Sequence, residues 1–184
     1  LFGSSAIAGT INIITKEPVR NSASISHTTS NINSRAAFDH NTSLNASLVT
    51  DDNEMGIAVF GQNRQKDGYD HDGDGFTELT EMNGQTLGMR GYLKTGIYSK
   101  VTAEYHHLQE FRRGGDNLQL PPHEAMIAEQ VDHSINTGSV KYDWYAPNEK
   151  HMVNAFASIQ HINRESYYGA GKDPNAYGET TDLT

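Results

Sequence analysis

The fold class of this chain is decided by the segment Val101-Thr102-Ala103-Glu104-Tyr105-His106-His107. Apolar and polar residues alternate in it, which is the period-two pattern of a β-strand with one apolar and one polar face. Similar alternation recurs along the chain, whereas the helical period is almost absent. The pattern predicts about seven strands, at 20–31, 38–50, 55–66, 85–95, 100–113, 131–145 and 150–168. The sequence therefore predicts an all-β fold of antiparallel strands.

The connections between these strands sort by length. The short ones are 51–54, 96–99 and 146–149, and they alternate with long ones at 67–84, 114–130 and 169–184. Short turns at one end and long loops at the other are typical of an outer-membrane β-barrel. A soluble β-sandwich or solenoid would also have alternating strands, but its strands are normally shorter and its turns do not sort by length. We therefore expect 19–184 to form part of a transmembrane β-barrel.

The composition agrees with a barrel and excludes several functions. The chain has 23 acidic and 14 basic residues, a formal net charge of −9, and no basic run, so nucleic acid is not expected as a partner. The absence of cysteine excludes disulfides, thiolate metal sites and thiol nucleophiles. Only 35% of the residues are hydrophobic, which is low for a conventional core. A barrel that lipid covers on its apolar face and that has a polar lumen would explain this low value.

The first residues differ from the alternating strands that follow. From Gly3 to Lys16 the chain follows the pattern Gly-Ser-x-Ala-Ile-x-Gly-x-Ile-Asn-Ile-Ile-Thr-Lys. This segment closely resembles the end of the plug domain in TonB-dependent outer-membrane receptors, where it stands just before the first barrel strand. The resemblance implies that 1–18 ends a plug domain and that the chain is an internal fragment of a receptor with about 22 strands. It also implies that the long loops are extracellular and the short turns periplasmic.

The same resemblance implies a function. These receptors import scarce metal chelates or vitamins of the siderophore, haem or cobalamin class through the outer membrane of Gram-negative bacteria. Their partners are the TonB complex, which is reached through an N-terminal region that this chain lacks, the small-molecule ligand and outer-membrane lipid. The chain is then a transport protein and not an enzyme, and no residue is predicted to be catalytic. The alternatives are a soluble calcium-stabilised β-module of a surface adhesin and, less well supported, an outer-membrane hydrolase, for which no nucleophile has a base at a recognisable spacing.

The acidic segment 70–81, inside the loop 67–84, predicts a metal site. Compared with the twelve-residue EF-hand loop, its acids occupy positions 1, 3, 5, 9 and 12, and they are Asp70, Asp72, Asp74, Glu78 and Glu81. Gly75 stands at position 6, where that loop turns sharply, and Phe76 would offer its backbone carbonyl at position 7. Strands flank the segment instead of helices, so we predict a Ca²⁺ loop on a hairpin. A solvated acidic loop tip that binds nothing is the alternative.

Three further residues are candidates for contacts with a ligand. His106 shares a strand face with Thr102 and Glu104, so it points to the lumen if Val101, Ala103 and Tyr105 face lipid. It would then be either a ligand contact or an ordinary polar residue of the wall. Arg112 and Arg113 stand at the start of the loop 114–130 and could bind an anionic chelate or pair with nearby acids and phosphates.

Overall fold

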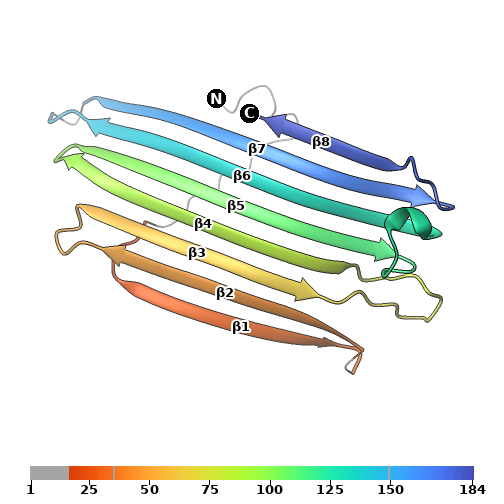
Figure 1. The fold of residues 1–184 in the computed structure, drawn as a ribbon. Coiled ribbons are helices and arrows are strands. Elements are labelled where there is room, and N and C mark those ends of the chain that lie inside the picture. Colours follow the sequence, from red (N-terminus) through yellow and green to blue (C-terminus); the bar gives the residue numbers. More distant parts are fainter. Residues whose placement is uncertain (1–16, 35, 149) are drawn as a thin grey trace.

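The computed structural model describes residues 17–34, 36–148 and 150–184. The predicted plug segment therefore lies outside the described residues, apart from Glu17 and Pro18. The described chain forms one antiparallel sheet of eight strands that follow one another in sequence order (Figure 1). The strands are β1 (Ser22–Ile32), β2 (Ala37–Val49), β3 (Met55–Lys66), β4 (Glu81–Gly96), β5 (Ser99–Gly115), β6 (Ile127–Tyr145), β7 (Met152–Ala170) and β8 (Tyr177–Leu183). The all-β, antiparallel prediction is confirmed.

The predicted number and bounds of the strands need correction. The segment 169–184 was predicted to be a loop, but Tyr177–Leu183 forms β8, which pairs with the end of β7. The strands β4, β5 and β6 also extend into the predicted loops 67–84 and 114–130. The added stretches have no run of apolar residues along one face, as in Tyr-Gly-Glu-Thr-Thr-Asp-Leu of β8. Periodicity finds a strand only where one face is apolar, so these stretches gave no signal.

Helix contributes little to the fold. The part of the chain that the structure describes contains one short 3-10 helix, η1 (Pro122–Glu124), between β5 and β6. No helix in the described ranges is long and apolar enough to cross a membrane.

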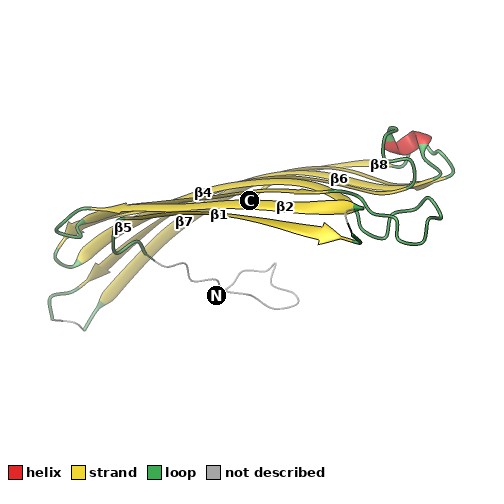
Figure 2. Cartoon of the chain, turned by 90° about the horizontal axis from the view of Figure 1, so that it is seen from below, coloured by secondary structure: helices red, strands yellow, loops and turns green. Residues whose placement is uncertain are grey.

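The sheet is a single curved layer, with the long connections and η1 gathered at one end (Figure 2). Within the described residues, β1 and β8 each have one neighbouring strand. Few hydrophobic residues of the described chain are buried; they are Ala37, Tyr69, Tyr92, Ala125, Ala128, Ala146 and Tyr167. Backbone pairing between neighbouring strands therefore holds the sheet together, without a packed core between two layers.

One face of the sheet is apolar and exposed. The register aligns apolar residues of neighbouring strands; for example, Leu93 of β4 lies opposite both Met55 of β3 and Val101 of β5. We call the exposed large residues of this face the apolar band; they are Ile25, Leu44, Leu48, Met55, Ile57, Leu87, Met89, Leu93, Tyr105, Val140, Tyr142, Val153 and Ile159. Toward the long loops the same face becomes polar, with Thr42, Asn63, Gln85, His107, Asn136 and His161 next along their strands. The band thus occupies only the half of the sheet nearer the short turns.

The opposite face, which we call the polar face, carries charged side chains that pair across and along strands. Its ion pairs are Arg64–Asp39 at 2.6 Å, Arg90–Glu104 at 3.1 Å, Arg112–Glu110 at 2.7 Å and Lys141–Asp143 at 2.8 Å. Hydroxyl and amide groups also bond across strands on this face, including Ser26 with Ser43 and Gln62 with Asn41. Exposed Phe156 is an apolar exception.

The chain reaches β1 from the polar face. The Glu17 carboxylate lies 2.6 Å from Nζ of Lys100 and 3.7 Å from Arg90, and both of these residues belong to that face. The next residue, Pro18, is buried, and a Cβ added at Gly56 would lie 3.2 Å from its ring. The residues just before β1 are therefore held against β3, β4 and β5 on the polar side.

Gly115 allows the end of β5 to turn into the next loop. It has a φ of +104°, and a Cβ there would lie 2.1 Å from the Ile127 carbonyl oxygen. We predict that Gly115→Ala lowers the free energy of unfolding by about 2–4 kcal/mol, because backbone strain and overlap with backbone add together. The matched control is Gly61→Ala, where the nearest atom would be 3.4 Å away. Urea unfolding of both variants tests this, and equal effects would contradict it.

Candidate functional site

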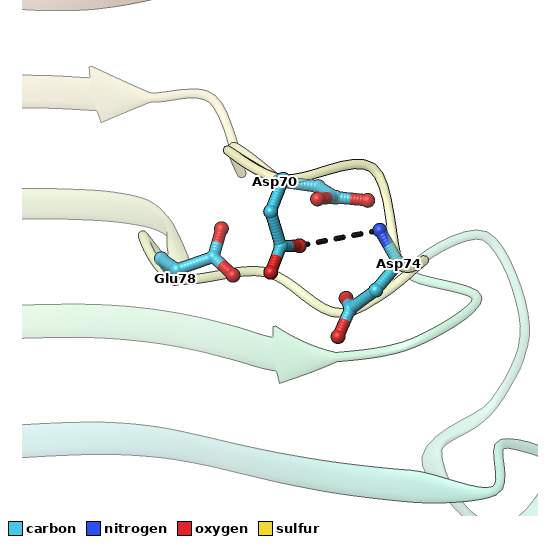
Figure 3. A group of neighbouring side chains, drawn as sticks. Asp70, Asp74 and Glu78 are labelled. Atoms are coloured by element: carbon cyan, nitrogen blue, oxygen red, sulfur yellow. Dashed lines mark hydrogen bonds between the residues drawn. The ribbon is translucent and has the colours of Figure 1, made fainter.

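The acidic segment lies in the connection 67–80, between β3 and β4. Tyr69 and Leu79 close this loop by exchanging two backbone hydrogen bonds, of 2.9 and 3.1 Å. Between them, Asp70, Asp72, Asp74 and Glu78 each provide a carboxylate oxygen, and these atoms all lie within 4.8 Å of one another. Figure 3 shows Asp70, Asp74 and Glu78 gathered within the loop. Such a group could hold a metal ion, as the sequence predicted.

Local backbone geometry brings these carboxylates together. The Asp70 carboxylate accepts hydrogen bonds from the N–H groups of Gly73 at 2.7 Å and Gly75 at 2.8 Å. Both glycines have positive φ, +80° and +93°, a conformation that costs a side chain about 1–2 kcal/mol. The Asp74 carboxylate in turn accepts from the N–H of Phe76 at 2.9 Å. Gly75 therefore makes the sharp turn that its position in the motif predicts.

The six predicted ligands are not all in this group. Among the described residues, Glu81 is not part of the carboxylate cluster; it begins β4 and pairs in register with Arg113. Phe76 lies in the loop directly after Gly75. The four remaining acids would bring a formal charge of −4 into a small space, and this repulsion favours a bound cation. Carboxylate oxygens are the donors that hard cations such as Ca²⁺ and Mg²⁺ prefer.

Contacts on two sides hold the acidic loop in place. The Asn33 side-chain amide, in the β1–β2 turn, donates to the hydroxyl of Tyr69. On the other side, the backbone N–H of Thr77 donates to the Gly115 carbonyl at 3.1 Å, and the N–H of Gly115 donates to the Thr77 hydroxyl at 3.1 Å. The loop therefore connects the end of β1–β2 with the end of β5.

The neighbouring connection 116–126 is anchored by Asp116, which is buried. Its carboxylate accepts hydrogen bonds from the N–H groups of Ile127 at 2.9 Å and Met126 at 3.3 Å, and from the Asn117 amide at 2.6 Å. Burial acts to raise the pKa of Asp116, but these hydrogen bonds together outweigh it, so the pKa lies below its usual value. The ionised carboxylate thus stabilises the closed end of this loop.

The candidate ligand contacts occupy different environments. Arg113 is buried, 1% exposed, and it donates to the backbone carbonyl of Gly114 at 3.2 Å. It lies beside a small cluster formed by Tyr167, Ala125 and Ala128. His106 lies on the polar face, 3.5 Å from Glu104 and in ring contact with Phe60. Arg112 is the one of the three that lines a cavity at the loop end, as described below.

Sequence reasoning missed several residues of this region. Asp116 and Tyr167 were not identified as loop anchors, and Arg164 was not identified as a neighbour of Arg112. No short motif joins these residues, because they come from different strands and loops. Only the pairing register brings them together. Arg112 of β5 lies opposite Val131 of β6, and Val131 lies opposite Ser166 of β7, which is on the same strand as Arg164.

Ca²⁺ binding provides a direct test of the acidic loop. We predict that the variant Asp72→Asn, Asp74→Asn binds Ca²⁺ at least about tenfold more weakly than the original chain, because two charges are lost while the side-chain shape is kept. The control variant Asp51→Asn, Glu179→Gln loses the same charge at exposed positions outside the loop. Isothermal titration calorimetry compares them, and equal weakening in both would contradict a defined site.

Asp116 predicts a pH dependence that is local to one loop. Because its folded pKa is lowered, its contribution to stability is complete above the unfolded value of about 4 and is lost as the pH falls through the folded pKa. Hydrogen exchange at the Ile127 amide, corrected for its intrinsic rate, should therefore accelerate below about pH 4. In Asp116→Asn this exchange should be faster at neutral pH and should lose the acid dependence. An unchanged acid dependence in the variant would contradict the anchor.

Comparisons of the chain with protein-family models, with curated proteins and with solved structures gave no match.

Proposed function

We propose that the chain is part of a TonB-dependent outer-membrane receptor that takes up a scarce metal chelate or vitamin. The sheet would be part of the transmembrane β-barrel, with the apolar band against lipid and the polar face toward the lumen. The observation that carries this proposal is the exposure of the whole apolar band on one face of a single-layered sheet. The function of the receptor is binding and transport, not catalysis.

Lipid accounts for the exposed band better than water does. Burying a Val, Leu, Ile, Phe or Met side chain is worth roughly 1.5–3 kcal/mol, and most members of the band are of these types. In β4 the band runs from Leu87 to Leu93, roughly 20 Å along the strand at about 3.4 Å per residue. At a tilt of about 40° this corresponds to roughly 16 Å along the membrane normal, and exposed Ile97 and Tyr98 beyond the strand continue the apolar surface toward the height of about 25 Å in outer-membrane barrels.

The residues before β1 support a plug inside the lumen. The ion pairs of Glu17 with Lys100 and Arg90 hold this segment on the polar face, the side that would enclose a plug. The preceding segment, from Gly3 to Lys16, is the one that resembles the end of a plug domain. In the proposed receptor, the energising TonB complex would act on the plug.

The long-loop end would be extracellular and would capture the ligand. Here the connection 67–80 is tied to the ends of β1–β2 and β5, so the loops form one connected surface. Ca²⁺ bound by Asp70, Asp72, Asp74 and Glu78 would hold the acidic loop in one conformation before the ligand arrives. Such preorganisation lowers the entropy cost of binding.

Spin labelling at single cysteines tests the membrane assignment, since the chain has no cysteine of its own. We predict that labels at Met89 and Ala157, on the apolar face, collide with dissolved oxygen and are protected from a water-soluble nickel chelate in lipid vesicles. Labels at Ser139 and Ser158, on the polar face, should show the reverse. Collision rates from electron paramagnetic resonance give the comparison.

If the chain were instead a soluble β-module of a surface adhesin, the spin labels would give a different result. Its apolar face would be covered by protein, so labels at Met89 and Ala157 would be protected from both reagents in buffer without lipid. That result would contradict the receptor proposal.

A further inference from the structure

A polar cavity lies on the polar face at the long-loop end of the sheet. Its volume is about 500 Å³, and its walls come from β5, β6 and β7 and from Thr80, just before β4. The charged and polar residues that matter to the argument are Glu110, Arg112, Glu129, His133, Arg164 and Tyr168. The register explains how they meet, because His133 of β6 lies opposite both Glu110 of β5 and Arg164 of β7. A cavity of this size accommodates a small organic molecule.

The two arginines of the cavity differ in their partners. Nε of Arg112 lies 2.7 Å from Oε1 of Glu110, so an acid already neutralises this guanidinium. Arg164 has no carboxylate within 4.0 Å among the described residues, and within them its guanidinium donates one hydrogen bond, from Nη2 to the Tyr168 hydroxyl at 3.2 Å. Its Nε is buried and has no hydrogen-bond partner in the described chain. A desolvated donor without a partner is unfavourable, and more so when it is charged.

Because Nε of Arg164 is closed off, a ligand in the cavity would meet the Nη groups, which also match the two oxygens of a carboxylate or the oxygens of a phosphate. We propose that this cavity binds a small molecule through an oxyanion, with Arg164 as the group that anchors it and Tyr168 beside it. The acids Glu110 and Glu129 in the same cavity disfavour a ligand that carries many uncompensated negative charges. They suit one that presents hydroxyl or amino donors next to its oxyanion. The role of this cavity in capture rests on the proposed receptor function, whereas the binding chemistry depends on the cavity alone.

The polar cavity is also distinct from the carboxylate cluster of the acidic loop, although Thr80 of the same connection lines it. None of the cavity-lining residues belongs to the carboxylate cluster of Asp70, Asp72, Asp74 and Glu78. The loop would take a cation and the cavity an anion, so the two sites at this end of the sheet have opposite charge preference.

The test uses the whole chain folded in lipid or detergent, with citrate and inorganic phosphate as probes in isothermal titration calorimetry. We expect at least one probe to bind, and the stronger one identifies a carboxylate or a phosphate preference. Arg164→Gln should weaken that binding by at least about tenfold. Arg20→Gln, which removes the same charge at an exposed position outside the cavity, should leave it within about twofold.

Two more variants separate anchoring from simple charge. Arg164→Lys keeps the charge but loses the two-pronged geometry, so it should still weaken binding several-fold, while its circular dichroism reports whether the sheet is intact. Glu110→Gln should strengthen binding, because it releases Arg112 from its ion pair and gives the cavity a second available cation. Binding of neither probe, or equal affinities in Arg164→Gln and Arg20→Gln, would overturn the proposal.

These outcomes are independent of the membrane assignment. Spin labels that report lipid contact together with absent anion binding would remove the cavity proposal and leave the receptor proposal standing. Anion binding that depends on Arg164, in a chain that folds in water, would remove the receptor proposal and leave the cavity proposal standing.

Discussion

The fold depends on the fact that a single layer of β-strands cannot cover its own faces. Backbone hydrogen bonds between neighbouring strands satisfy the polar groups of the chain, but they leave the side chains of both faces to the surroundings. On the polar face, the side chains form ion pairs and hydroxyl pairs with one another. The other face presents the apolar band. Whatever covers this band therefore supplies the stabilisation that a packed core supplies in an ordinary globular domain.

The difference between the faces explains which strands were predictable. Period-two alternation identified the parts of β1–β7 that cross the band, such as Leu87 to Leu93, because polar and apolar residues separate there. It failed for β8 and for the loop-side ends of β4–β6, where no run of apolar residues follows one face. These segments are strands because a longer neighbour offers them a hydrogen-bonding edge, which is a property of the pairing and not of their own sequence.

The candidate sites divide in the same way. The acidic loop was predictable because its carboxylates and its turning glycine lie within one short segment with fixed spacing. Its fifth acid, Glu81, departs from the motif because the second flank is a strand that starts at that residue. The cavity around Arg164 was not predictable, since its walls come from three strands far apart in sequence. Arg112 and Arg113 are adjacent, yet strand alternation sends one toward this cavity and buries the other on the opposite side.

The most direct test of this account is to dilute the urea-unfolded chain into buffer and into lipid vesicles and to follow far-ultraviolet circular dichroism. If lipid covers the apolar band, β-structure should form with vesicles, and in buffer the chain should stay unfolded or aggregate. Quenching of Trp144, the one tryptophan, by brominated lipid would locate the short-turn end of the sheet at the bilayer. A monomer that folds cooperatively in buffer and ignores the vesicles would contradict the central claim.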